Sequence, residues 1–279
     1  MTKPGRGSSG ALRGQAGVVR ALVVAGFLAW TSGGTVSVEA AEGKGEVAVA
    51  AAADLKFALD EIIAALRQRR PDLRVTPTYG SSGNFYSQLS NRAPFDMFFS
   101  ADRAFIEKLV AQDVTIAGSE FLYAIGRIVV WVPRSSPLDI EKQGIAVLKD
   151  PRVRRISIAN PRHAPYGRAA EAALRSLGIY EEVKDKLVLG ENVSQAAQFV
   201  QSGAAEAGVI ALSLALAPAL QKEGRFWTVP QDAYPPLEQG GVLLKWARDP
   251  AAAQAFRAFV LGPAGREVLR KYGFDLPAQ

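Results

Sequence analysis

The sequence predicts an α/β fold of two lobes, each a mixed, mostly parallel sheet flanked by helices. Short apolar segments alternate with amphipathic helical segments along the chain, which is typical of mostly parallel sheets. Two stretches, 122–126 and 229–241, have the character of crossings between lobes, and the second is rich in proline and glycine. If both cross, the middle of the chain forms one lobe and the two ends form the other. Such a clamshell would hold a ligand between its lobes.

The elements follow from local patterns. Residues 46–52 are apolar and strand-like, and apolar residues at helical spacing predict a helix over 55–69, which Pro71 ends. Gly178 ends another helix, over 167–177. The other strands are predicted from short runs that are apolar, β-branched or alternating. The other helices are predicted from stretches whose apolar residues recur at helical spacing. We expect strands at 73–79, 95–100, 128–132, 155–159, 187–189, 208–211 and 226–229, and helices from 81 and over 103–112, 250–260 and 263–271. Lobe I is predicted to comprise residues 41–123 and 238–279, and lobe II residues 124–237.

The first 40 residues are predicted to be a cleavable signal peptide. Basic residues end at Arg20, residues 21–30 are apolar, and the small residues before Ala40 suit cleavage after that residue. The apolar run, of about ten residues, is too short to span a bilayer core of roughly 30 Å as a helix. The alternative is an uncleaved anchor.

Composition excludes several classes of protein. The chain has 279 residues, 48% hydrophobic and 22% charged, which allows a large core and argues against disorder. It has no cysteine and one histidine, His163, which excludes disulfides, thiolate metal sites and a multi-histidine zinc site. We find no basic stripe for nucleic acid, no Walker-type phosphate loop and no complete nucleophile elbow. Neither a nucleic-acid partner nor an enzyme is expected.

Small polar residues and glycines gather where strands pass into helices. The four junctions are Ala53-Asp54, Ser81-Ser82, Pro165-Tyr166-Gly167 and Asn192-Val193-Ser194. The first turn of a helix has free N–H groups and a partial positive charge. Several such turns facing one cleft could hold a dianion without lysine or arginine. The alternative is that each junction is only a helix cap, since Ser, Asp and Asn are preferred there.

Six segments, in order along the chain, carry a resemblance to a known family. They are 51–55 (AAADL), 79–83 (YGSSG), 98–102 (FFSAD), 160–167 (NPRHAPYG), 191–193 (ENV) and 271–274 (KYGF). With these segments, residues 47–276 resemble the periplasmic molybdate-binding proteins of ABC importers. The resemblance implies a type II periplasmic-binding-protein clamshell that takes molybdate or tungstate as ligand, needs no cofactor, and delivers the ligand to an ABC permease in the inner membrane.

The resemblance also implies which residues contact the oxyanion. Ser82 matches a serine that offers both its hydroxyl and its backbone N–H, and Tyr166 and Val193 match positions that offer backbone N–H. Asp54 falls where the family usually has serine or asparagine. One branch of the family adds a tyrosine hydroxyl late in the second lobe, where this chain has Ala211, so that contact is lost. The Tyr166 ring is a candidate replacement.

Asp54 raises a conflict of charge. Molybdate is fully deprotonated at neutral pH and, like an ionised carboxylate, can only accept hydrogen bonds. Two anions about 4 Å apart repel by roughly 4 kcal/mol at an effective dielectric constant near 20. Three interpretations are open. In the first, which we expect, the carboxylate caps the helix by accepting from the N–H of Lys56 or Phe57. In the second, the carboxyl is protonated, or it accepts a proton from a partly protonated ligand such as hydrogen phosphate. In the third, the protein is a divergent relative that binds another ligand.

Other polar residues near these motifs have simpler interpretations. We expect His163, Arg162 and Arg168 to be solvated loop residues; the alternatives are a lid or hinge contact for His163 and anion steering by the two arginines. Asp96 and Asp102 are expected to be turn or cap residues and not metal ligands.

We therefore expect an exported, monomeric periplasmic binding protein for an oxyanion. One alternative keeps the clamshell and changes the anion to phosphate, phosphonate or sulfate. Another is a sensory or regulatory effector-binding domain, since fold alone does not define function. The signal peptide and the lack of a helix-turn-helix segment argue against a DNA-binding version.

Overall fold

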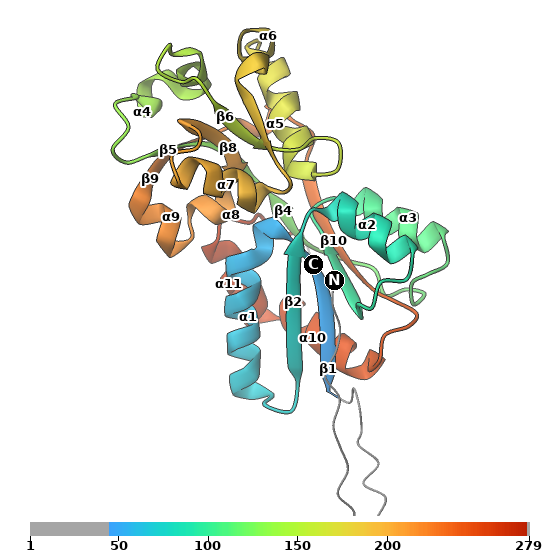
Figure 1. The fold of residues 1–279 in the computed structure, drawn as a ribbon. Coiled ribbons are helices and arrows are strands. Elements are labelled where there is room, and N and C mark those ends of the chain that lie inside the picture. Colours follow the sequence, from blue (N-terminus) through green and yellow to red (C-terminus); the bar gives the residue numbers. More distant parts are fainter. Residues whose placement is uncertain (1–44, 278–279) are drawn as a thin grey trace, which may run out of the picture. The chain divides into compact units, whose positions relative to one another are not determined.

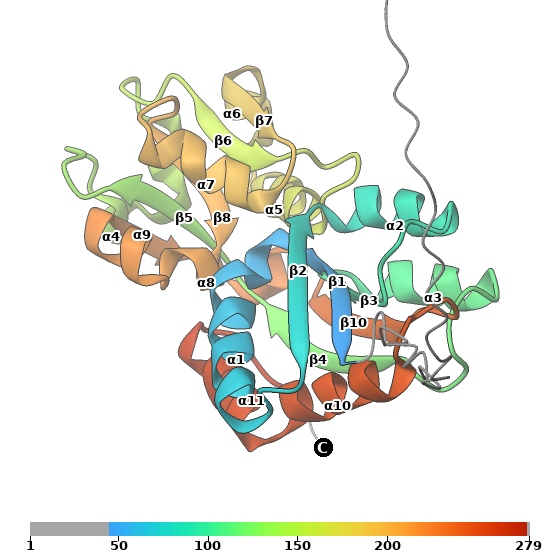
Figure 2. The same ribbon diagram turned by 60° about the horizontal axis from the view of Figure 1, so that its bottom comes forward.

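The computed structural model describes residues 45–277, which form two five-stranded mixed sheets flanked by helices (Figures 1 and 2). The predicted two-lobed α/β fold is confirmed. The signal peptide predicted at residues 1–40 lies outside the described residues. No helix within 45–277 has the length and apolar character needed to cross a membrane.

The sheet of lobe I has the strand order β2-β1-β3-β10-β4. Its strands are β1 (Glu46–Ala52), β2 (Arg74–Gly80), β3 (Met97–Ser100), β4 (Phe121–Gly126) and β10 (Leu237–Leu243). Strand β1 runs parallel to β2 and β3, whereas β10 runs antiparallel to β3 and β4. The helices of this lobe are η1 (Ala53–Leu55), α1 (Lys56–Arg69), α2 (Ser82–Ser90), α3 (Arg103–Ala111), α10 (Pro250–Leu261) and α11 (Pro263–Lys271).

Side chains of β1 alternate between two apolar layers, because successive residues of a strand face opposite sides of the sheet. Val49 and Ala51 belong to the cluster under α1, α10 and α11. Ala50 belongs to the cluster on the other face, under α2 and α3. Burial on both faces explains why β1 is apolar at nearly every position. Figure 2 shows α10 and α11 on one side of this sheet and α2 and α3 on the other.

The sheet of lobe II has the strand order β7-β6-β8-β5-β9. Its strands are β5 (Ile128–Pro133), β6 (Ile156–Ala159), β7 (Leu187–Gly190), β8 (Ala207–Ala211) and β9 (Gly224–Thr228). Strand β6 runs parallel to β7 and β8, and β5 runs antiparallel to β8 and β9. The helices are α4 (Ile140–Gln143), η2 (Gly144–Lys149), α5 (Pro165–Ser176), α6 (Tyr180–Val183), η3 (Lys184–Lys186), α7 (Val193–Gln201), α8 (Leu212–Ala215), α9 (Pro218–Glu223) and η4 (Gln231–Ala233).

The chain crosses between the lobes at two places. Only Arg127 separates β4 in the first sheet from β5 in the second. The return runs from the end of β9 at Thr228 to the start of β10 at Leu237. Strands β4 and β10 themselves pair antiparallel, with an irregularity between Gln239 and Gly240. The first predicted crossing segment, 122–126, therefore lies within β4, and the second, 229–241, contains η4 and ends in β10. The lobe limits proposed from the sequence stay a prediction.

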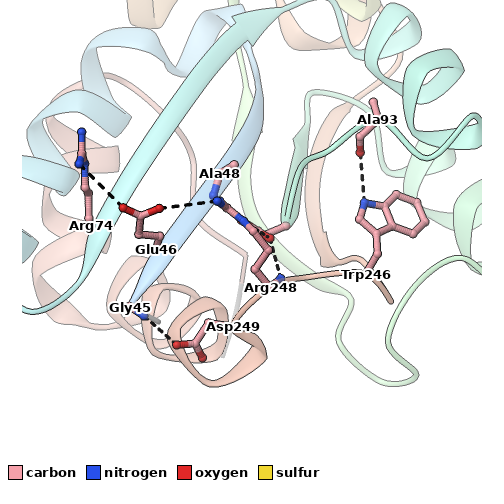
Figure 3. Close-up of polar contacts among 9 residues, drawn as sticks. Gly45, Glu46, Ala48, Arg74, Ala93, Trp246, Arg248 and Asp249 are labelled. Atoms are coloured by element: carbon pink, nitrogen blue, oxygen red, sulfur yellow. Dashed lines mark hydrogen bonds and ion pairs between the residues drawn. The ribbon is translucent and has the colours of Figure 1, made fainter. Parts of the chain in front are cut away.

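A buried carboxylate ties the start of β1 to the segment that follows β10. Asp96, which is 2% exposed, accepts hydrogen bonds from the backbone N–H of Ala48 (2.6 Å) and of Arg248 (2.8 Å) and from the Arg248 guanidinium (2.8 Å). Arg248 also lies near Glu46, which pairs with Arg74 on β2 (Figure 3). Asp96 is thus a structural ion-pair partner, and the expectation of a turn or cap residue was wrong because its side chain joins segments far apart in sequence.

Replacing Asp96 by alanine is expected to lower the free energy of unfolding by about 2–3 kcal/mol at pH 7, because the buried N–H of Ala48 and the Arg248 guanidinium lose a charged partner. Burial raises the pKa of Asp96, but the hydrogen bonds from Arg248 and Ala48 outweigh burial, so the pKa lies below its ordinary value of 3.8. The difference from wild type should therefore be full above pH 4 or so and vanish as the pH falls through the lowered pKa.

Urea denaturation at several pH values measures this difference. Asp72→Ala is the matched control, because Asp72 is exposed and its pair with Arg70 is a surface ion pair. Equal urea midpoints for Asp96→Ala and Asp72→Ala at pH 7 would contradict the structural role given to Asp96.

Candidate functional site

A small pocket lies where the four predicted junctions meet. Its walls come from both lobes. The lining residues are Ala52, Ala53, Asp54, Gly80, Ser81, Ser82, Ala101, Ala164, Pro165, Tyr166, Asn192 and Val193. The structure thus brings together all four predicted contact residues, Asp54, Ser82, Tyr166 and Val193. Ala211 ends β8 and is fully buried, but it does not line the pocket.

Three helices begin at the pocket, and the side-chain caps of α2 and α7 each occupy only the third N–H of the helix. Ser81 Oγ caps α2 by accepting from the N–H of Asn84 (3.4 Å), and Asn192 Oδ1 caps α7 by accepting from the N–H of Gln195 (3.0 Å). Helix α5 begins with Pro165, which has no N–H. The N–H groups of the first positions have no intrahelical partner. Capping and anion binding are therefore compatible here.

These helix starts are the source of positive partial charge among the lining residues, because none of the lining residues is lysine or arginine. Ser82 adds a hydroxyl. Its Oγ accepts a hydrogen bond from the N–H of Ala101 (2.9 Å), so its own hydrogen is free to be donated. The pocket therefore offers neutral donors to a small ligand that carries acceptor oxygens.

Asp54 does not cap its helix, which corrects the interpretation expected from the sequence. Neither η1 nor α1 has a side-chain cap, and the N-cap position of η1 is occupied by Ala52. The Asp54 Oδ2 atom instead accepts hydrogen bonds from Tyr166 Oη (3.0 Å) and Gln239 Nε2 (2.7 Å). Asp54 lies inside the helical turn, two residues past the cap position, and donors from α5 and β10 meet its carboxyl there.

Burial changes the ionisation of this group. The Asp54 side chain is almost fully buried, and burial raises its pKa to about 6 although the hydrogen bonds from Gln239 and Tyr166 act to lower it. Burial also raises the pKa of Tyr166 and of Tyr123 well above 10, so both phenols stay protonated. With this pKa the carboxyl is mainly ionised at pH 7 but takes up a proton far more readily than an ordinary aspartate, so of the three interpretations the protonated carboxyl becomes accessible.

Gln239 is a part of the site that sequence reasoning missed. It is fully buried on β10, its Oε1 accepts from Tyr123 Oη (2.8 Å), and its Nε2 also donates to Tyr166 Oη (3.0 Å). Gly126 makes room for this network, since a Cβ there would overlap Tyr166 Oη and lie 2.7 Å from Gln239 Nε2. No local signal marks Gln239, because it falls in a stretch with the composition of a linker.

The two lobes touch around the pocket through hydrogen bonds from α2. The N–H of Gly83 donates to the carbonyl of His163 (2.9 Å), and Ser81 Oγ lies 2.8 Å from His163 Nδ1. A Cβ on Gly83 would overlap that carbonyl, so the close approach requires glycine here. His163 is thus an interlobe contact and not the solvated loop residue expected, because the fold places the start of α2 against its loop.

Other interlobe contacts anchor η1 and α3. Ser194 Oγ donates to the carbonyl of Ala53 (2.9 Å), and Ser213 Oγ donates to the carbonyl of Asp54 (2.8 Å). Arg168 forms an ion pair with Asp102 across the lobes, so the solvated role expected for Arg168 was wrong. Asp102 also caps α3, as predicted, and Arg162 is exposed, as expected.

Comparison with known proteins gives consistent matches over the described chain. Residues 47–275 match the family model described as bacterial extracellular solute-binding protein. The chain is 42% identical over 231 residues to the molybdate-binding protein ModA of Azotobacter vinelandii, covering 83% of this chain and 90% of that protein. It is 40% identical over 230 residues to ModA of Rhodobacter capsulatus, covering 82% and 88%.

A solved structure agrees with these relatives. The periplasmic molybdate-binding protein of Azotobacter vinelandii superposes with a TM-score of 0.78 at 32% identity, covering 83% of this chain and all of that one. From the family match, the relatives and the two-lobed fold, this chain belongs to the bacterial extracellular solute-binding proteins.

Proposed function

We propose that this protein captures molybdate, or the related tungstate, in the pocket between its lobes and presents it to an ABC permease. The observation that carries the proposal is the meeting of three helix starts and a serine hydroxyl at one pocket without lysine or arginine. Relatives named as molybdate-binding proteins support the choice of ligand.

Each proposed contact has a distinct chemical role. Ser82 donates from its hydroxyl and its backbone N–H, and Tyr166 and Val193 donate from backbone N–H at the starts of α5 and α7. Asp54 contributes from η1. Neutral donors that are already oriented suit a dianion, since little free energy is lost in reorganising them when the dianion binds.

Closure of the lobes completes the site. The carbonyl of His163 and the Arg168–Asp102 pair hold the lobes together at the rim of the pocket. Once closed, the pocket excludes bulk water, which strengthens each hydrogen bond to the anion. The closed form then presents the surface that a permease would recognise.

The cellular location and the oligomeric state of the protein are part of the same proposal. We infer that residues 1–40 direct export to the periplasm and are removed, and that the mature chain acts as a monomer without enzymatic activity.

Hydrogen phosphate is the alternative ligand, and the chemistry of Asp54 makes it the anion to compare with molybdate. A buried carboxylate such as Asp54 can accept a hydrogen bond from a protonated anion, which molybdate at neutral pH is not. Sulfate shares the charge and shape of molybdate and would be rejected through pocket size alone.

A thermal-shift and calorimetry panel on the mature chain, residues 41–279, tests the proposal with molybdate, tungstate, sulfate and phosphate. A ligand that binds only the folded form adds about 2.7 kcal/mol of stability at 100 times its Kd. We expect that stabilisation from molybdate and tungstate and little from sulfate. Tight binding of phosphate without any response to molybdate would overturn the choice of ligand.

A further inference from the structure

One buried carboxyl oxygen at the pocket has no hydrogen-bond partner among the described residues. Asp54 is 1% exposed and lines the pocket. Both donors that reach its carboxyl, Tyr166 Oη and Gln239 Nε2, approach Oδ2. Oδ1 is buried and makes no hydrogen bond within 45–277, although the backbone N–H of Asp54 itself is near enough to lower the pKa of the carboxyl. A buried polar atom without a partner is costly, so this oxygen requires an explanation.

The partners of Oδ2 decide which oxygen carries a proton when the carboxyl is neutral. Tyr123 Oη donates to Gln239 Oε1, which orients the amide so that its Nε2 group donates to Oδ2. Tyr166 Oη donates to the same atom. An oxygen that already accepts two hydrogen bonds is the carbonyl-like oxygen of the acid. The proton of a neutral Asp54 therefore sits on Oδ1.

Within residues 45–277, the groups packed against Asp54 include no cation that would hold it ionised. They are the phenol of Tyr166 on α5, the phenol of Tyr123 on β4, the amide of Gln239 on β10 and the hydroxyl of Ser213 on α8, which donates to the Asp54 carbonyl. His163 contacts Ser81 rather than Asp54, and Arg168 pairs with Asp102. Burial without a cation favours the neutral acid.

We propose that Asp54 binds the oxyanion as a neutral carboxylic acid, donating one hydrogen bond from Oδ1 to a ligand oxygen, so that binding takes up one proton from solvent. The inference rests on the proposed function and adds how the site accepts a dianion beside an acidic residue. The neutral Asp54 then donates a hydrogen bond that a ligand oxygen accepts, and the repulsion between two anions is removed. The one covalent bond that forms is the O–H bond between Oδ1 of Asp54 and the proton taken from solvent.

The expected signature is a dissociation constant that rises with pH. With a pKa of about 6 in the free protein, the neutral fraction falls about tenfold per pH unit above that value, and the apparent Kd rises by the same factor. We expect the Kd for molybdate to rise about a hundredfold between pH 6.5 and 8.5. Calorimetry at pH 7.5 in two buffers with different ionisation enthalpies should count about one proton taken up per ligand.

Asp54→Asn separates the proton from the geometry. The asparagine oxygen can keep the hydrogen bonds from Tyr166 and Gln239, and its amide places a permanent donor where Oδ1 stood. This variant should bind molybdate with a Kd that is flat from pH 6.5 to 8.5 and with no proton uptake. At pH 8.5 it should bind about three-hundredfold more tightly than wild type, because only about 0.3% of wild-type Asp54 is neutral there. Asp72→Asn makes the same chemical change at an exposed site and should behave as wild type.

The outcomes separate this inference from the proposed function. If no oxyanion binds the folded wild-type protein at any pH, the proposed function fails. If molybdate binds with a flat Kd and no proton uptake, the function stands and the inference is overturned. If hydrogen phosphate binds tightly to wild type and not to Asp54→Asn, Asp54 is an acceptor and the inference is also overturned. The buffer experiment uses wild type alone, so it decides the matter even if the variant folds poorly.

Discussion

Replacing Gly83 by alanine is expected to weaken oxyanion binding by about 5- to 150-fold while leaving the free protein folded. The added Cβ would overlap the backbone carbonyl of His163, and a backbone atom cannot turn aside as a side chain can. Overpacking of this kind costs about 1–3 kcal/mol, here in the closed form only. Alanine also favours a helix over glycine by roughly 1 kcal/mol, so α2 itself should not suffer.

Calorimetry with molybdate and thermal melting without ligand test this prediction together. Gly262→Ala is the matched control, since a Cβ there meets only carbonyls of the preceding helix, the nearest at 3.1 Å, away from the pocket. The Gly262 variant should keep wild-type affinity. Wild-type affinity in the Gly83 variant would show that the approach of α2 to the His163 loop is not needed for binding.

Replacing Val193 by proline is expected to weaken molybdate binding by about 10- to 150-fold with little loss of stability. Proline suits the first position of a helix, and Asn192 before it already has an extended backbone. The change therefore removes one N–H from the pocket and leaves α7 in place. A hydrogen bond to a charged group contributes about 1.5–3 kcal/mol, which sets the size of the effect.

Val193→Ala provides the opposite test. It keeps the N–H and removes buried apolar surface, because Val193 is 3% exposed. We expect a lower melting temperature and unchanged affinity. If the alanine variant lost affinity and the proline variant did not, the contact would belong to the side chain, and the backbone role of Val193 would be wrong.

Much of the fold could be predicted from local patterns. The helix over 55–69 and the strand over 46–52 have clear periodicity, and the structure places α1 and β1 there within one residue at each end. Strands β4 and β10 were less visible, because their residues follow no clean alternation and become strands only by pairing with each other. Helices α8 and α9 were missed because each is short and depends on packing in lobe II.

For the site, sequence indicated which residues meet but not how they interact. Asp54, Ser82, Tyr166 and Val193 were recognised as helix starts and by resemblance, and the pocket contains all four. The partners of the Asp54 carboxyl were out of reach of any local rule. Gln239 lies 185 residues further along the chain, and it meets Asp54 only after β10 has been inserted between β3 and β4.

The sequence by itself determined the α/β class, the two lobes and the helix starts, because these depend on periodicity and capping within a few residues. Tertiary structure alone decided that Asp54 faces Tyr166 and Gln239 instead of its own helix, and that His163 closes on Gly83. The ionisation of a carboxyl depends on burial and on donors brought from distant segments, and no short stretch of sequence contains that information.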